Sequence, residues 1–326
     1  MSGALQARVN DRPVTVTLVV PVFNEASAIV LFLTRVKAVF DGVPRLKGEV
    51  LFVNDGSTDD TLDLIVEQQK KFAPLVIRAL ELSRNFGKEA ALAAGLAEAS
   101  GDVVIPIDVD LQDPPELIPV MIERWESGYD VVLARRVDRS HDPLMKRLTA
   151  DWFYRLHNAI SNPPLPANVG DFRAMDRAVV EVINALPETQ RFMKGLFAWV
   201  GFRSCMVDYS RPERSAGQSK FNSWKLWNFA LEGITSFSAA PLRMWTYLGT
   251  LISLASFIFA ATVVIRVWVY GVDVPGYASL MVAVAFFGGI QLIGIGALGE
   301  YLARTYMESK RRPLYVIRRR FPDPSS

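Results

Sequence analysis

The first 220 residues alternate between two patterns of apolar and polar positions. Short apolar runs typical of buried strands are followed by segments in which apolar residues recur every three to four positions, as on the inner face of a helix. In chain order these segments are 14–22, 28–40, 48–55, 61–72, 75–82, 88–100, 101–108, 115–127 and 129–136. The alternation predicts an α/β domain with a largely parallel sheet.

Two later stretches carry no charged residue at all. Met244 to Ile265 is a run of 22 residues, and Val274 to Gly299 is a run of 26. Each is long enough to cross the roughly 30 Å hydrocarbon core of a bilayer as a helix, and uncharged runs beyond about 18 residues are rare in soluble domains. The pattern therefore predicts a hairpin of two transmembrane helices.

The basic residues predict how this hairpin is oriented. The segment 1–13 is polar, and the apolar run 14–22 is too short to act as a signal peptide, so the N-terminal domain is expected to stay in the cytosol. Arg243 precedes the first span and a basic segment follows the second, whereas the connecting turn offers only Arg266 and Asp273. The positive-inside rule then places both ends in the cytoplasm, in a protein integral to the inner (plasma) membrane.

We therefore expect four parts: a cytosolic α/β domain over 1–220, a juxtamembrane segment over 221–243, the two spans over 244–303 and a basic cytosolic tail over 304–326. In the second part, apolar residues and tryptophans recur as in an amphipathic helix at the head groups. The basic tail suits anionic lipids. Small residues in the second span favour close helix contacts, either within the hairpin or between subunits of a homo-oligomer.

Polar residues collect where the predicted strands end. They are Asn24 and Glu25, Asn54 and Asp55, Asp108 and Asp110, and Arg135 and Arg136. Ligands of open α/β sheets bind beyond the carboxyl ends of the strands, so these side chains should converge on one cleft. Taken singly, Asp55 could be only a turn residue and Asp113 only a helix cap. The functional interpretation depends on the joint pattern.

Asp108 and Asp110 are separated by one residue and need a compensating cation. Hard carboxylate oxygens suit Mg²⁺ or Mn²⁺, whose coordination is completed by substrate phosphates, and a bound metal would therefore hold a diphosphate. The chain has neither GxxxxGK[ST] nor GxGxxG. With two histidines and one cysteine, a zinc site is not expected. No nucleic-acid partner is expected.

Five motifs in order, "PVFNE", "VNDGSTDDT", "DVDLQDPPE", "GDFR" and "RSAGQSKF", are followed by the two apolar runs. In this respect the chain resembles the polyprenyl-phosphate glycosyltransferases of glycosyltransferase family 2, a group that includes the bacterial bactoprenol glucosyltransferases and is related to the dolichol-phosphate mannose synthases. The resemblance covers the chain beyond the first dozen residues. It implies a GT-A-like nucleotide-binding catalytic domain, a divalent metal, a nucleotide-sugar donor and a polyprenyl phosphate acceptor such as undecaprenyl phosphate.

The resemblance also implies roles for individual residues. Asp110 with Gln112 would hold the metal, and the residues implied for the nucleotide and donor site are Pro21, Phe23, Glu25, Asp55, Asp108 and Arg136. Those expected near the acceptor phosphate are Arg147, Arg211, Arg214 and Lys220, and those implied in catalysis are Asp108, Asp110, Asp171 and Arg214.

The basic residues before the first span have a physical reason to be there. A lipid monophosphate, with a second pKa near 6, is mostly ionised at cytosolic pH, so it needs cations to approach a diphosphate more than it needs a general base. Arg211, Arg214 and Lys220 stand where such a head group would arrive, although a merely juxtamembrane basic patch is the alternative. Asp171 could be a base, an orienter of the acceptor, a support for the basic cluster or a structural partner of Arg173.

Other functions fit less well. A processive polysaccharide synthase would need more spans and a QxxRW motif, and "QRFMKGLFAW" lacks that spacing. A non-catalytic membrane scaffold would have no reason to keep every metal and phosphate candidate. UDP-glucose is the first choice of donor by resemblance, with a UDP-linked amino sugar, a modified arabinose and GDP-mannose as alternatives.

Overall fold

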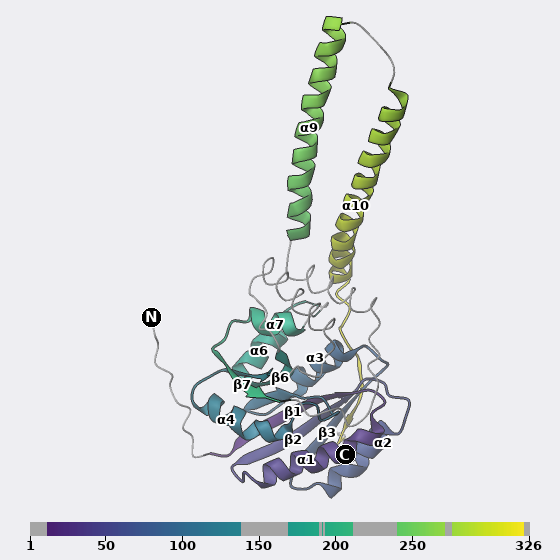
Figure 1. Ribbon diagram of the computed structural model, residues 1–326. Helices are drawn as coiled ribbons and strands as arrows, with labels where there is room; N and C mark the ends of the chain where they lie inside the picture. The colour runs from purple at the N-terminus through teal and green to yellow at the C-terminus, as the bar shows by residue number, and fades with distance from the viewer. Residues whose placement is uncertain are drawn as a thin grey trace.

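The computed structural model describes residues 12–137, 169–188, 191, 193–210, 240–270 and 276–322. Within these ranges one eight-stranded sheet has the order β7-β5-β6-β4-β1-β2-β3-β8. The strands are β1 (Val14–Val22), β2 (Leu46–Asn54), β3 (Val76–Leu82), β4 (Val103–Pro106), β5 (Val131–Arg136), β6 (Val169–Asp176), β7 (Ser204–Tyr209) and β8 (Ile317–Phe321). Helices cover both faces of the sheet (Figure 1).

The predicted parallel sheet is confirmed in the centre. Strands β1, β2, β3 and β4 pair in parallel, as do β5 and β7. The sheet is mixed elsewhere, because β6 runs antiparallel between β4 and β5, and β8 runs antiparallel to β3. The alternating pattern located the first five strands within two residues at their starts, but it did not predict β6, β7 or β8 as strands.

Two apolar layers hold the helices on the sheet. One layer joins strand residues to α1 (Ala26–Asp41), α2 (Thr61–Lys71) and α4 (Ile118–Glu126), which follows the short 3₁₀ helix η1 (Pro115–Leu117). The other joins them to α3 (Lys88–Glu98), α6 (Arg177–Ala185) and α7 (Met193–Trp199). Strand β1 is buried on both faces, which explains its nearly continuous apolar sequence.

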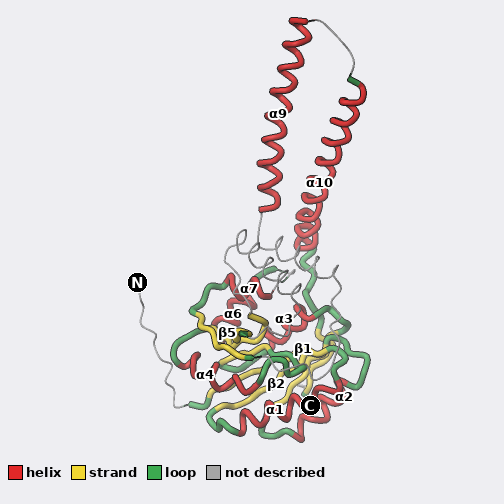
Figure 2. Tube along the Cα trace, viewed as in Figure 1, coloured by secondary structure: helices red, strands yellow, loops and turns green. Residues whose placement is uncertain are grey.

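Two long helices extend away from this domain. Helices α9 (Ala240–Tyr270) and α10 (Tyr277–Ser309) project from the same side of the sheet and run side by side (Figures 1 and 2). Trp245 packs over Gly294, where an added Cβ would lie 3.5 Å from the indole. At 1.5 Å per residue each helix is roughly 45–50 Å long.

Among the described residues, one segment, Phe286–Ser309, is long and apolar enough to cross a membrane. Large apolar side chains on both helices are exposed, including Phe257, Trp268 and Leu292. The predicted boundaries differ from the structure, because α9 is already helical from Ala240 and α10 continues to Ser309. Glu300 pairs with Arg304 one turn later, at 3.3 Å.

Part of the predicted basic tail, Ile317–Phe321, belongs to the sheet of the folded domain. After α10 the chain returns to the sheet and forms β8 beside β3. Arg318 and Arg319 donate to the Glu81 carboxylate at 3.1 and 2.6 Å, and Arg320 donates to Glu98 at 2.7 Å. The arginines of β8 are therefore paired with carboxylates of the domain rather than placed to bind lipid head groups.

Candidate functional site

The carboxyl ends of β1 to β4 meet at one edge of the sheet, as predicted. The register pairs Val22 with Asn54 and Asn54 with Glu81, so the loops after β1, β2 and β3 are neighbours. Strand β6 enters this edge from the opposite direction. Its pairing with β4 sets Val104 beside Met175, and the same register extended past β4 sets Asp108 opposite Asp171. The antiparallel strand therefore brings the aspartate of "GDFR" to the aspartates that follow β4.

The loops after β1 and β2 are fastened together by side chains of the first two motifs. Asn24 has a φ of 55°, and its Oδ1 accepts from the backbone N–H of Thr58 at 2.8 Å. The backbone N–H groups of Asn24 and Glu25 donate to the hydroxyls of Ser57 and Thr61, each at 3.0 Å. This cross-linking fixes the backbone around the predicted nucleoside pocket.

The residues implied for that pocket line its mouth to different degrees. Phe23 is 44% exposed at the end of β1, whereas Pro21 and Glu25 are half-buried. An exposed aromatic ring on a fixed loop is a surface on which a nucleobase can stack. The positions fit the sequence prediction, and the contact with a base stays a prediction.

Asp55 is buried and holds the loop that follows β3. Its two carboxylate oxygens accept from the backbone N–H groups of Phe86 and Gly87 at 2.7 and 2.8 Å. Burial raises the pKa of Asp55, and these two hydrogen bonds act in the opposite direction. The turn itself is capped by Asn54, whose Oδ1 accepts from the Ser57 N–H at 3.0 Å. In this structure Asp55 therefore positions the start of α3, and its place in the nucleotide and donor site stays a prediction.

Lys88, the first residue of α3, joins the two aspartates of the site. Its Nζ lies 2.7 and 2.8 Å from the two oxygens of Asp108 and 3.1 Å from Oδ2 of Asp171. Burial would raise the pKa of Asp171, but the nearby charges of Lys88, Lys194 and Arg173 lower it below its ordinary value. The same pair of carboxylates raises the pKa of Lys88. Asp171 is therefore ionised and paired at neutral pH.

One alternative for Asp171 was a structural pairing with Arg173, and the structure shows a different pairing. Arg173 is buried and donates to the backbone oxygens of Gly170 and Asp171, at 2.6 and 3.4 Å, and its guanidinium lies over the ring of Phe197. The side-chain partner of Asp171 among the described residues is thus Lys88 rather than Arg173. Burial lowers the pKa of Arg173 to about 10.

Glu89 is a second acidic group beside Asp171. Its carboxylate accepts from the backbone N–H of Met193 at 3.1 Å. Burial, and then the charge of Asp171, raises the pKa of Glu89 to about 7. The site therefore contains one carboxylate held ionised and a neighbour that titrates near neutrality.

Asp110 and Gln112 lie on a tight turn after β4. Leu111 between them has a φ of 57°, and the Gln112 N–H donates to Oδ1 of Asp110 at 3.1 Å. The turn offers the half-exposed carboxylate of Asp110, a hard donor of the kind that Mg²⁺ and Mn²⁺ take, whereas Gln112 is 4% exposed. Across the described parts of the chain no group of three or more His, Cys, Asp or Glu side chains could enclose a metal. The donor set fits an ion that takes its remaining ligands from substrate and water.

The predicted basic residues are only partly described. Arg136 ends β5, half-buried, and its neighbour Arg135 forms a two-point pair with Asp208 at 2.7 and 2.9 Å. The remaining predictions lie outside the described residues: Arg147, Arg211, Arg214 and Lys220, together with the segment 221–239.

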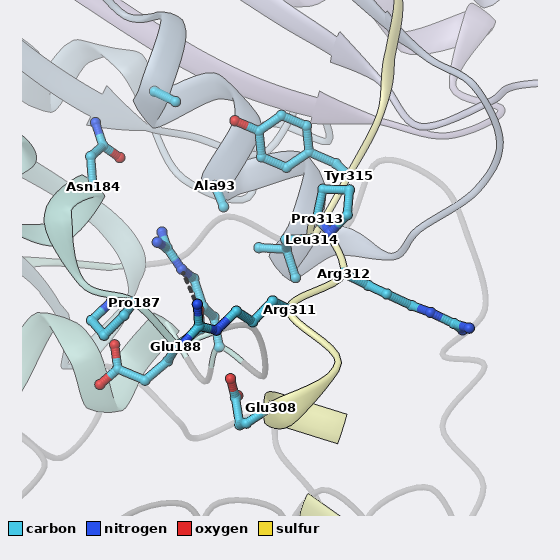
Figure 3. A pocket seen from close by; sticks show the side chains of 12 residues that line it. Ala93, Asn184, Pro187, Glu188, Glu308, Arg311, Arg312, Pro313, Leu314 and Tyr315 are labelled. Atoms are coloured by element: carbon cyan, nitrogen blue, oxygen red, sulfur yellow. Dashed lines mark hydrogen bonds between the residues drawn. The ribbon is translucent and has the colours of Figure 1, made fainter. Parts of the chain in front are cut away.

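A cavity of about 670 Å³ lies elsewhere, between α3, α6 and the turn that follows α10. Asn184 and Tyr315 lie on its domain side, with Arg311 and the α10 residue Glu308 toward the long helices (Figure 3). None of the predicted site residues that the structure describes lines it. The polar strand ends, rather than this cavity, therefore define the candidate site.

Lys88 and Glu89 were missed by the sequence prediction. The predicted cleft is built from polar residues at the ends of the first, second, fourth and fifth strands. It includes no residue from the end of the third strand. There the sequence "SRNFGKE" follows β3 directly. Parallel strands bring all such loops to one edge, so this segment carried the same signal.

The model of the family "Glycosyl transferase family 2" matches residues 17–183. A protein of Shigella phage SfV named bactoprenol glucosyl transferase is 56% identical over 303 residues, which cover 93% of this chain and 98% of the phage protein. An Escherichia coli K12 protein named prophage bactoprenol glucosyl transferase homolog is 54% identical over 304 residues, with 93% and 98% covered. A solved structure of the mannosyltransferase PcManGT from Pyrobaculum calidifontis, in complex with GDP-Man and Mn²⁺, has a TM-score of 0.49 at 18% identity and covers 91% of this chain and 89% of that chain.

Proposed function

Because the chain belongs to glycosyl transferase family 2 and is a glycosyltransferase, we propose that it moves a glucosyl group from UDP-glucose to a polyprenyl phosphate. A phosphate oxygen of the acceptor forms the new bond to the anomeric carbon, and the bond from that carbon to the diphosphate breaks, which releases UDP. The product is a lipid-linked monosaccharide. The names and high identity of the relatives support both the glucosyl group and the polyprenyl acceptor.

The observation that carries this proposal is the meeting of Asp108 and Asp171 with Lys88 at one sheet edge, two residues before the turn of Asp110. The loops after β1 and β2 form a fixed, partly aromatic platform beside it. A nucleotide on that platform would carry its diphosphate toward the aspartates. The arrangement suits a reaction in which an anionic leaving group must be held and stabilised.

We propose that Asp110 and Gln112 hold the divalent cation. When bound, Mg²⁺ or Mn²⁺ would stabilise the negative charge that develops on the leaving diphosphate, a contribution that is usually among the largest in catalysis. The protein provides the hard oxygen donors on a turn fixed by its own hydrogen bond. Arg136, Arg147, Arg211, Arg214 and Lys220 remain our candidates for the phosphates of donor and acceptor.

The acceptor places the enzyme at a membrane, and we propose that α9 and α10 form a two-span hairpin with the catalytic domain on the cytosolic side. Three features support this: the apolar segment Phe286–Ser309, the side-by-side course of the two helices, and the return of the chain to the sheet as β8. A homo-oligomer remains part of the proposal, because an added Cβ at Gly288, Gly289, Gly296 or Gly299 would meet none of the described residues within 4 Å.

A turnover assay tests the function directly. Purified protein is given undecaprenyl phosphate and Mg²⁺ or Mn²⁺, with UDP-glucose, UDP-GlcNAc, UDP-galactose or GDP-mannose supplied separately and EDTA as the control. We expect metal-dependent formation of one lipid-linked sugar, with UDP-glucose as donor. Transfer from another donor alone would correct the sugar, and a folded protein that binds no nucleotide would overturn the proposal.

A further inference from the structure

The contact between Lys88 and the two aspartates links parts of the site that come from different strands. Asp108 follows β4, Asp171 belongs to the antiparallel strand β6, and Lys88 opens α3. The Lys88 side chain is 48% exposed, whereas that of Asp171 is 19% exposed. The lysine therefore reaches from the open side of the site onto a carboxylate that is mostly enclosed.

Asp171 is held by one oxygen only. Oδ2 receives Lys88 at 3.1 Å, whereas Oδ1 is buried and has no hydrogen-bond partner among the described residues. Buried polar atoms nearly always have a partner, and an exception needs an explanation such as a ligand or a catalytic role. Oδ1 of an ionised carboxylate accepts hydrogen bonds or coordinates a cation, so the missing partner is a hydrogen-bond donor or a metal ion.

The chemistry of the reactants narrows the choice of that partner. An ionised acceptor phosphate has few protons to give. A second metal ion beside Oδ1 would lie close to the ammonium group already bound to the other oxygen, and the two positive charges would repel each other. The hydroxyl groups of a sugar are neutral donors of the required kind.

We propose that Lys88 is a positioning residue: it fixes Asp171 through Oδ2, so that Oδ1 accepts a hydrogen bond from a hydroxyl of the transferred sugar. This inference rests on the proposed function and deepens it, because it names a residue pair that selects the donor. Asp171 then touches the sugar, and Lys88 acts on the sugar only through Asp171. Asp55 supports the position of Lys88 in turn, because it accepts hydrogen bonds from the backbone directly before Lys88.

The test compares UDP-glucose with its 2-, 3-, 4- and 6-deoxy analogues in the full-length protein. In the wild type we expect one analogue to lose on the order of 10- to 100-fold in kcat/KM, as when a charged acceptor is left without its partner. In Lys88→Gln, kcat/KM for UDP-glucose should fall by a similar factor, and the discrimination against that analogue should shrink toward onefold. Lys88→Arg should restore part of kcat/KM for UDP-glucose and part of the discrimination against that analogue.

Lys37→Gln is the matched control, because Lys37 also pairs with a carboxylate, Asp41, but on the exposed face of α1. It should leave rate and discrimination unchanged. Discrimination that is equal in wild type and Lys88→Gln would overturn the positioning role, and a wild type that accepts every analogue equally would overturn the contact to a hydroxyl. If Lys88→Gln loses UDP binding and its melting transition, Lys88→Arg decides: kcat/KM for UDP-glucose and the discrimination should fall together in that variant, and a lower kcat/KM with unchanged discrimination overturns the inference.

A second measurement separates this inference from the proposed function. If the wild type transfers no sugar from any donor, the proposed function fails on its own. The positioning role is then decided by an experimental structure of Lys88→Gln, in which the carboxylates of Asp108 and Asp171 should move apart. Carboxylates that stay in place would overturn it.

Discussion

A Cβ placed on Gly56 would lie 2.7 Å from the carbonyl carbon of Arg84, in the loop that follows β3. Gly56 also has a φ of +70°, a backbone conformation that residues with side chains rarely adopt. The loops after β2 and β3 are therefore in contact at Gly56. The neighbouring residue Asp55 accepts the hydrogen bonds that position the backbone before Lys88.

Gly56→Ala should consequently lower both stability and nucleotide affinity. We expect a loss of about 1–3 kcal/mol from backbone strain and loop displacement, with weaker UDP binding in calorimetry. Gly201→Ala is the matched control, because Gly201 has a similar φ of +67° and the nearest described atom to an added Cβ, the backbone oxygen of Trp199, lies 3.7 Å away. Equal melting temperatures for the two variants would show that the loop contact has no role.

Asp110→Asn should abolish metal-dependent transfer without unfolding the protein. The amide oxygen can still accept from the Gln112 N–H, but the charge that holds the cation is gone. We expect kcat to fall by at least about 100-fold, measured over a range of Mg²⁺ and Mn²⁺ concentrations. Asp41→Asn, at an exposed ion pair on α1, serves as the control. Full activity in Asp110→Asn would remove this residue from the metal site.

Glu89 should make stability depend on pH. Its pKa is about 7 in the folded protein, against about 4.3 in an unfolded chain, so the folded state binds the proton more tightly. Stability from this group is complete below about pH 4 and is lost as the pH rises through 7, by at most about 4 kcal/mol. The groups that set this pKa are Asp171, Lys88 and Lys194.

Glu89→Gln removes that titration and keeps an acceptor for the Met193 N–H. Melting temperatures of variant and wild type should therefore differ more in favour of the variant at pH 8 than at pH 5. Differential scanning fluorimetry in detergent at several pH values measures this. A difference that does not change with pH would mean that Glu89 titrates normally.

Glu81→Ala should loosen β8. The Glu81 side chain is 9% exposed and receives both Arg318 and Arg319. Without it, two arginines lose their partner at the sheet edge, and we expect a loss of about 1–3 kcal/mol. Limited trypsin digestion followed by mass spectrometry should detect faster cleavage after Arg318, Arg319 and Arg320. Glu67→Ala, at an exposed ion pair on α2, should leave the cleavage rate unchanged.

Much of the fold could be predicted because its signal is local. The central strands are buried on both faces and follow one another in a regular order, so apolar runs such as 14–22 mark them clearly. Strands β7 and β8 lie at the two edges of the sheet and keep an exposed face, as "SCMVDY" and "IRRRF" show. Charged edge strands resemble loops or tails, and only pairing across the sheet identifies them.

The site was predictable where function and strand ends coincide. Asp108 and Asp110 follow a strand that the pattern identified, so their place at the sheet edge could be derived. Asp171 lies in a strand that the pattern missed, and only the antiparallel register with β4 explains why it faces Asp108. Lys88 looked like an ordinary start of a helix, because a contact across three elements leaves no periodic trace in the sequence.

The position of β8 ties the completion of the catalytic sheet to the order of synthesis. In the proposed two-span topology, the ribosome makes β1 to β7 first, then both membrane helices, and only afterwards the strand that covers β3. Until that strand arrives, β3 presents an unpaired edge of the kind through which proteins aggregate. If only one of the two helices crossed the bilayer, β8 would lie on the opposite side of the membrane from β3, so a complete catalytic sheet would itself exclude insertion of a single helix.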